Sequence, residues 1–145
     1  MKVCIAYESK YGNGKKCVEH LKDIIIKKGH AVDLFSVRDV KPNDLLQADI
    51  YMFSAPTQIG SPARKMKKFL KKINITQEGA KYALITTHSS DETEALEKME
   101  KILQPTGMAK ITGGLKIKVT GMKGPLEEGY EEKIEAFAND ILDSG

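Results

Sequence analysis

Short apolar segments that suit β-strands alternate with longer segments of helical periodicity along the whole chain. The expected strands are residues 2–7, 31–36, 49–54, 81–87 and 115–119. The expected helices are residues 13–29, 61–73 and 91–103, followed by a terminal helix with an apolar stripe from Tyr130 to Leu142. Strands without polar alternation that are separated by helices are typical of a parallel sheet covered on both faces. The pattern therefore predicts an α/β fold.

The number of strand–helix units fits one doubly wound sheet. A chain of 145 residues, 41% hydrophobic and 30% charged, can bury a core of its own, so residues 1–145 are expected to form a single domain. Five parallel strands with helices on both faces favour the order 2-1-3-4-5. In that order, ligands bind beyond the carboxyl ends of the strands at the switch point between strands 1 and 3. We therefore expect the loops after strands 1, 3 and 4 to carry the function.

The loop after the first strand, residues 8–15, reads Glu-Ser-Lys-Tyr-Gly-Asn-Gly-Lys and leads into a helix. The first N–H groups of a helix lack intrahelical partners, and the helix dipole adds partial positive charge, so an anion is favoured there. The Ser9 hydroxyl and the Asn13 amide are further donors, and Gly12 and Gly14 allow close approach to the backbone. The loop predicts a phosphate site, with an ordinary tight turn as the alternative.

The loop after the third strand, residues 54–62, reads Ser-Ala-Pro-Thr-Gln-Ile-Gly-Ser-Pro. Pro56 and Gly60 are expected to fix an irregular loop whose backbone can face a planar heterocycle. Thr57 and Gln58 offer polar groups for the edge of such a ring, while Ile59 can cover its face. The alternative is a turn that only leads into the next helix.

Two helices are expected to begin at recognisable capping residues. Ser61 followed by Pro62 has the form of an N-cap with proline at the first helical position. Asp91 followed three residues later by Glu94 resembles a capping box.

Several other kinds of site are excluded by the residues at key positions. A Walker A loop needs glycine where Ser9 stands and serine or threonine where Lys16 stands, and a dinucleotide fingerprint needs glycine at Cys17. The two cysteines and three histidines lack metal-ligand spacing, and no serine lies in a Gly-x-Ser-x-Gly elbow. We therefore expect no metal, no hydrolase triad and no disulfide framework, which suits a reducing cytosol.

The functional loops together resemble those of the flavodoxin family. Residues 9–14 align with that family's phosphate loop, Ser/Thr-x-Thr-Gly-Asn-Thr, except that Tyr11 and Gly14 replace two threonines. Residues 56–60 and the later Lys-Lys-Phe-Leu of residues 67–70 are similar to the family signature Pro-Thr-x-x-Gly…Lys-x-Phe-Leu. The resemblance covers nearly the whole chain.

This resemblance implies a flavodoxin-like fold with FMN as cofactor. The residues that it places around the phosphate are Ser9, Lys10, Tyr11, Gly12, Asn13 and Gly14. The residues that it places on the two sides of the ring are Pro56, Thr57, Gln58, Ile59 and Gly60, and Thr87, His88 and Ser89. In the family an aromatic side chain often stacks on the ring. No aromatic lies in either ring-flanking loop here, and His88 is the nearest planar side chain.

The function that follows from the resemblance is electron transfer between redox partners in the cytosol, with FMN as the redox group and no catalytic side chain. One alternative is an NAD(P)H-dependent FMN or quinone reductase on the same scaffold. A second is an interaction module that has lost its cofactor, which the replacement at Gly14 and the missing stacking aromatics leave open.

The net charge of +3 is small, but cations gather on one face of the expected helix 61–73. This basic face comprises Arg64, Lys65, Lys67, Lys68, Lys71 and Lys72. It is either an ordinary solvated face or a docking surface for an acidic redox partner. No nucleic-acid motif accompanies it, and no pure apolar run in the sequence approaches the length of a membrane span.

Overall fold

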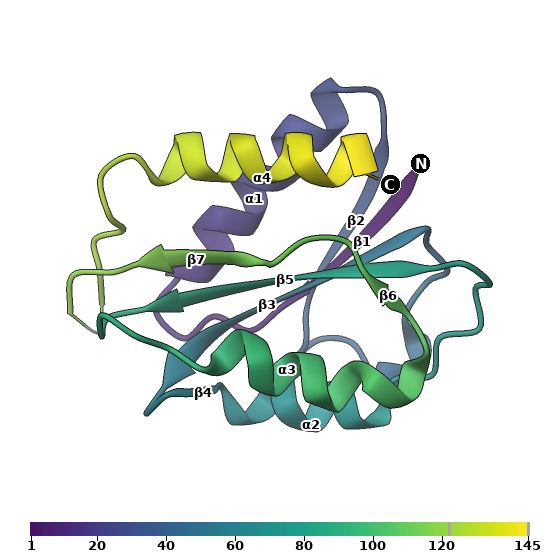
Figure 1. The fold of residues 1–145 in the computed structure, drawn as a ribbon, viewed down its shortest axis with the longest axis horizontal. Coiled ribbons are helices and arrows are strands. Elements are labelled where there is room, and N and C mark those ends of the chain that lie inside the picture. Colours follow the sequence, from purple (N-terminus) through teal and green to yellow (C-terminus); the bar gives the residue numbers. More distant parts are fainter. Residues whose placement is uncertain (122, 145) are drawn as a thin grey trace.

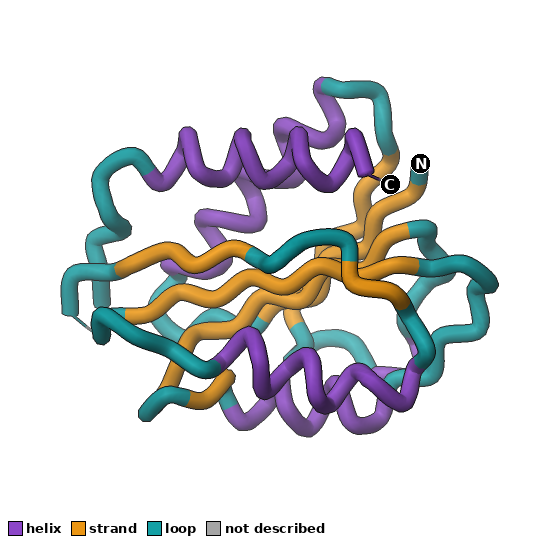
Figure 2. Tube along the Cα trace, viewed as in Figure 1, coloured by secondary structure: helices purple, strands orange, loops and turns teal. Residues whose placement is uncertain are grey.

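The computed structural model describes residues 1–121 and 123–144 as a parallel sheet between two layers of helices (Figures 1 and 2). Four long strands lie side by side in the order β2 (Ala31–Ser36), β1 (Lys2–Tyr7), β3 (Ile50–Gln58) and β5 (Lys81–His88). Two shorter strands, β6 (Ala109–Lys110) and β7 (Leu115–Lys118), both pair with β5. The predicted order 2-1-3-4-5 is therefore confirmed, with the fifth strand divided in two.

The division of the fifth strand has a local cause at Gly114. Its φ is 93°, a value that favours glycine, and its N–H donates to Thr112 Oγ at 2.9 Å. A Cβ at this position would lie 2.8 Å from a Leu96 methyl carbon and 3.1 Å from the Leu84 carbonyl oxygen. The backbone therefore bends close to β5 here, and only glycine fits the bend.

Four α-helices cover the two faces of the sheet. α1 (Asn13–Lys27) and α4 (Tyr130–Ser144) lie on one face, and α2 (Arg64–Lys72) and α3 (Ala95–Leu103) lie on the other, as Figure 1 shows. Two single 3₁₀ turns, η1 (Pro42–Asp44) and η2 (Gln104–Thr106), complete the described elements. No helix in residues 1–121 and 123–144 is long and apolar enough to cross a bilayer.

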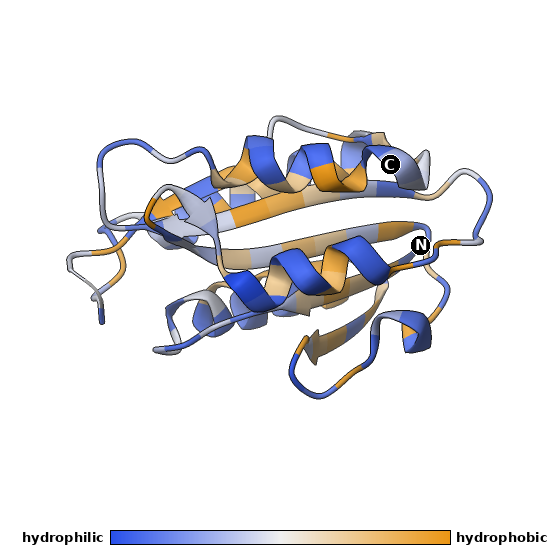
Figure 3. Cartoon of the chain, turned by 90° about the horizontal axis from the view of Figure 1, so that it is seen from below, coloured by the Kyte–Doolittle hydropathy of each residue, from blue (hydrophilic) through white to orange (hydrophobic). Residues whose placement is uncertain are grey.

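Alternating side chains of the strands fill two separate cores. On β1, Val3 and Ile5 pack with α1 and α4, while Cys4 and Ala6 pack with α2 and α3. Figure 3 shows hydrophobic residues along the strands, with hydrophilic residues dominating the helix surfaces. Because both faces of the sheet are buried, its strands need apolar residues at nearly every position, as the sequence pattern indicated.

Both predicted helix caps are wrong, because tertiary contacts use the residues involved. Ser61–Pro62 forms a short strand, β4, paired antiparallel with the end of β3, so α2 begins only at Arg64. Asp91 forms an ion pair with Lys118 at 2.6 Å, and α3 begins at Ala95. The N-cap residue of α3 is Glu94, and the N–H of Ala95 donates instead to Thr93 Oγ at 3.1 Å.

The two cysteines are buried, Cys4 in β1 and Cys17 on α1, and burial raises the pKa of both thiols to about 12. The reactive form of cysteine is the thiolate. At pH 8 a thiol of this pKa is ionised in only about one molecule in ten thousand. We expect a disulfide-exchange reagent at pH 8 to leave both thiols unmodified in the native protein and to modify both after unfolding in urea. Rapid modification of either thiol in the native protein would contradict the packing described here.

Candidate functional site

A cavity of about 450 Å³ opens at the carboxyl ends of the central strands. Its lining residues are Ser9, Lys10, Tyr11, Asn13, Pro56, Thr57, Gln58, Ile59, Thr87, His88, Ser89, Val119 and Gly121. Cavities of roughly 300–1,000 Å³ are typical of small-ligand and cofactor sites. The loops after β1, β3 and β5 thus converge on one hollow, at the edge of the sheet where doubly wound folds bind ligands.

The cavity wall contains all the site residues expected from the sequence except Gly12, Gly14 and Gly60. These three glycines lie beside wall residues in the same two loops. Sequence reasoning missed Val119 and Gly121, which follow β7. The available signal was topological, because β7 is the next strand beside β5 and its carboxyl end meets the same edge of the sheet.

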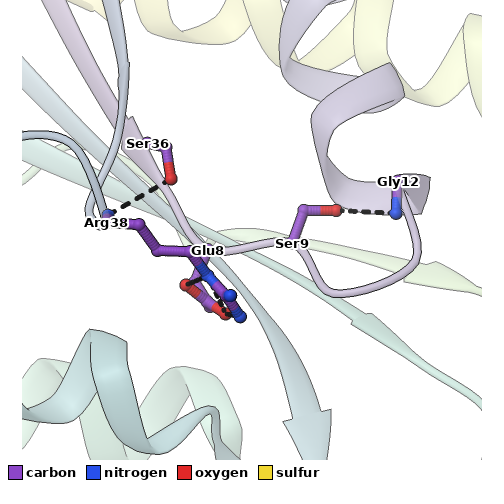
Figure 4. A network of polar contacts seen from close by, with 5 residues as sticks. All are labelled: Glu8, Ser9, Gly12, Ser36 and Arg38. Carbon is purple, nitrogen blue, oxygen red and sulfur yellow. Dashed lines mark hydrogen bonds and ion pairs between the residues drawn. The ribbon is translucent and has the colours of Figure 1, made fainter.

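The loop after β1 leads to the N-terminus of α1. Gly12 is the N-cap residue with φ of 90°, and its N–H donates to Ser9 Oγ at 3.1 Å (Figure 4). No acidic residue lies in the first turn of α1. The free N–H groups of that turn and the helix dipole therefore face no carboxylate of the same turn.

A buried hydroxyl lies beneath this loop. Ser54 is only 1% exposed, and its Oγ has no hydrogen-bond partner among the described residues. A Cβ added at Gly14 would lie 3.8 Å from this oxygen, 3.7 Å from Ser9 Oγ and 3.6 Å from the Glu8 carbonyl oxygen. Polar oxygens therefore surround the space that a side chain at position 14 would occupy. Buried polar groups are rarely left without a partner, so this arrangement marks a position of functional interest.

An ion pair between the buried Glu8 and the exposed Arg38 fixes the start of the same loop. Glu8 is 3% exposed and accepts from Arg38 Nε at 3.1 and 3.2 Å and from Arg38 Nη2 at 2.6 Å (Figure 4). The Glu8 N–H also donates to the Ser54 carbonyl at 2.8 Å. The hydrogen bonds and charge of Glu8 raise the pKa of the Arg38 guanidinium. Arg38 follows β2, so the ion pair joins the ends of β1 and β2 beside the loop.

The end of β3 folds into a tight hairpin, whereas an irregular loop was expected. Gln58 pairs with Ser61 and Thr57 with Pro62, which leaves Ile59 and Gly60 as the two residues of the turn. Both have positive φ, 50° and 75°, as in a type I′ turn. A β-branched residue is strained in this conformation. Ile59 nevertheless occupies it, fully exposed at the edge of the cavity.

The third wall is formed by the end of β5 and the segment after β7. His88 is 8% exposed, and its Nδ1 donates to the Ser90 carbonyl at 2.5 Å, because a carbonyl can only accept. The Val119 N–H donates to the His88 carbonyl at 2.8 Å. The ion pair between Lys118 and Asp91 lowers the pKa of the Asp91 carboxyl and raises that of the Lys118 ammonium. These contacts hold the third wall against the sheet.

Tyr11 places an aromatic ring at the mouth of the cavity. Its side chain is 40% exposed, and the Nζ atoms of Lys10 and Lys123 lie 5.4 and 5.9 Å from the ring centroid. These distances are in the range of cation–π contacts. The mouth of the cavity therefore carries an aromatic surface flanked by positive charge, a combination suited to anionic ligands with a planar part.

Comparison with known proteins gives one family and many similar folds. The family model described as Flavodoxin matches residues 5–137, and no curated protein matches the sequence. Flavodoxin 2 from Bacillus cereus is 24% identical over 100% of both chains, with a TM-score of 0.84. A flavodoxin from Streptococcus pneumoniae TIGR4 is 22% identical over 100% of both chains, with a TM-score of 0.81.

One similar structure was solved with a ligand. A Fusobacterium nucleatum flavodoxin mutant bound to flavin mononucleotide is 15% identical to this chain, with a TM-score of 0.71. The match covers 98% of this chain and 95% of that one. At these identities, the solved structures support the fold alone.

The strained turn gives a test of the hairpin. Replacing Ile59→Asn is expected to increase the free energy of unfolding by about 1 kcal/mol, because asparagine tolerates positive φ and Asn-Gly is the favoured type I′ pair. Urea unfolding of the protein without ligand measures the change.

The matched control changes the neighbouring residue of the same turn. A Cβ at Gly60 would meet no atom within 4 Å, but φ is 75° there. Gly60→Ala is therefore expected to lower the free energy of unfolding by about 1 kcal/mol through strain alone. If Ile59→Asn is also destabilising, the turn is not type I′.

Proposed function

Because this chain belongs to the flavodoxin family, whose cofactor is FMN, we propose that it carries electrons between redox partner proteins through an FMN bound in the cavity. The observation that carries the proposal is that a helix N-terminal loop and walls of mixed polarity line the same cavity. The loop before the N-terminus of α1 supplies one part of the lining, and polar and apolar residues from the ends of β3, β5 and β7 supply the rest. FMN has a phosphate and a planar ring, so it needs both.

The residues of the phosphate loop fit the phosphate of FMN. The Ser9 hydroxyl accepts from Gly12 N–H and still has its own hydrogen to donate. Asn13 lines the cavity and adds an amide donor. The unpartnered Ser54 hydroxyl lies under the loop, where Gly14 leaves room. We assign the phosphate to the residues of this loop, with the N-terminus of α1 stabilising its charge.

The walls beside the loop fit the ring of FMN. Ile59 offers an apolar face, Thr57 and Gln58 offer polar groups, and Tyr11 offers an aromatic surface at the mouth. His88 lies on the opposite wall with its Nδ1 already bonded, so its Nε2 is the nitrogen left for a ligand. When bound, FMN supplies the redox chemistry, and these residues bind it, orient it and exclude water from its face.

The basic face of α2 suits an acidic redox partner. Its cations are Arg64, Lys65, Lys67, Lys68, Lys71 and Lys72, opposite the buried residues Met66, Phe69 and Leu70. None of these cations forms an ion pair with another described residue. Because α2 begins directly after the hairpin that bears Ile59, this face extends from the edge of the cavity. A partner with surface carboxylates would dock there with its redox centre near the cavity.

Comparison of FMN with riboflavin tests the phosphate assignment. Ser9→Ala is expected to weaken FMN binding about tenfold or more, because a hydrogen bond to a charged group contributes about 1.5–3 kcal/mol. Riboflavin lacks the phosphate, so its affinity should be unchanged. Flavin fluorescence during titration of the apoprotein measures both affinities.

The control for this experiment is Ser90→Ala, because Ser90 lies just outside the cavity wall. It should alter neither affinity. Failure of the wild-type apoprotein to bind FMN would contradict the proposed function itself. An equal loss of FMN and riboflavin affinity in Ser9→Ala would contradict only the assignment of the phosphate to this loop.

Charge reversal tests the docking surface. Lys67→Glu with Lys71→Glu is expected to slow electron transfer to an acidic ferredoxin several-fold at low ionic strength, with the difference shrinking as salt screens the charges. Stopped-flow measurement over a salt series gives the rates. Lys27→Glu with Lys28→Glu, at the end of α1 on the other face of the sheet, makes the same change in net charge and should have little effect. If both pairs of substitutions slow electron transfer equally, the effect comes from net charge, and the docking surface on α2 is contradicted.

A further inference from the structure

Three threonine hydroxyls form a continuous chain behind the ring-side wall of the cavity. Thr57 Oγ lies 2.8 Å from Thr86 Oγ and 2.7 Å from Thr93 Oγ. Thr57 belongs to the cavity wall, whereas Thr86 and Thr93 do not and are 0% and 8% exposed. The chain therefore runs from the wall into the interior, between the end of β3 and the start of α3.

The direction of every hydrogen bond in this chain follows from the partners at its two ends. Thr86 Oγ lies 2.8 Å from the Ala55 carbonyl oxygen and 3.3 Å from that of Thr87, and both oxygens can only accept, so the single hydrogen of Thr86 is donated to them and not to Thr57. Thr57 must then donate to Thr86. Since Thr57 has no second hydrogen, Thr93 must donate to Thr57, and Thr93 in turn accepts from Ala95 N–H. All three hydroxyls are satisfied in one arrangement, which makes the network rigid.

A second contact ties the same hairpin to α3. Lys98 Nζ donates to Ser61 Oγ at 2.8 Å. Ser61 comes directly after the strained turn and three residues before the start of α2. Thr93 and Lys98 thus hold the two strands of the hairpin separately, at Thr57 on β3 and at Ser61 on β4. α3 therefore supports the hairpin from behind, although it contributes no residue to the cavity.

We propose that Thr93 is a positioning residue for the ring of FMN, acting through Thr57. Removal of its hydroxyl leaves Thr57 without its donor and Ala95 N–H without its acceptor. The end of β3 then loses its attachment to α3 next to a turn that is already strained at Ile59, and the wall moves out of place. The proposal rests on the proposed function, because it specifies how the chain holds the same cofactor.

The experiment compares Thr93→Val with Thr93→Ser in titrations with FMN and with riboflavin. Thr93→Val is expected to weaken both ligands equally, five- to tenfold, because the affected wall faces the ring that they share. Thr93→Ser keeps the hydroxyl and should restore most of the affinity. Equal loss for both ligands separates this effect from damage to the phosphate loop, which would weaken FMN alone.

Thr106→Val is the matched control. Thr106 Oγ donates to the Leu103 carbonyl at 2.6 Å and accepts from Met108 N–H, just as Thr93 accepts from the N–H two residues after it. Thr106 lies beyond the C-terminal end of α3 and outside the cavity. This variant should lose comparable stability in urea unfolding and keep wild-type affinity for both flavins.

The outcomes separate the inference from the proposed function. If the wild-type apoprotein binds neither flavin, the proposed function fails. If the wild type binds FMN, and Thr93→Val has the same flavin affinity as the wild type or as Thr106→Val, the positioning role is overturned. The proposed function then stands. A loss that Thr93→Ser does not restore also overturns it, because the effect would then come from packing.

Discussion

The parallel pairing of β1 with β3 is the constraint on which the site depends. Tyr7, the last residue of β1, pairs with Ser54 in the middle of β3, and the next contact, from Glu8 N–H to the Ser54 carbonyl, belongs to the loop. The proposed phosphate loop therefore leaves the sheet beside Ser54, three residues before β3 enters its hairpin at Thr57. A change in this register would shift the loop along β3 and away from the hairpin.

Much of the fold could be predicted because its signals are local. The apolar runs of β1, β3 and β5 and the stripe of α2 appear in the sequence at the spacing that the structure uses. The parallel order then followed from general rules of doubly wound sheets. The same rules brought the loop containing Ser9 and the segment containing Thr57 to one edge, without any knowledge of their contacts.

The errors concern residues whose partners lie far along the chain. Asp91 has the sequence of a capping residue, but Lys118, twenty-seven positions later, takes its carboxylate. Ser61 likewise has the form of a cap, but a strained two-residue turn returns it to β3. Nothing in the sequence near Glu8 indicates that Arg38 neutralises it. A local sequence pattern indicates the roles that are open to a residue, and tertiary contacts determine which of these roles it has in the structure.

Each of the two cores supports a different part of the candidate site. The loop after β1 precedes α1 and is supported by the core on that face, whereas the hairpin at the end of β3 is supported by α2, α3 and the opposite core. The sheet backbone is the principal link between the two halves. Substitutions in one core can therefore accumulate with little effect on the other. The loop proposed to bind the phosphate and the walls proposed to face the ring are then free to diverge separately among descendants of one ancestor.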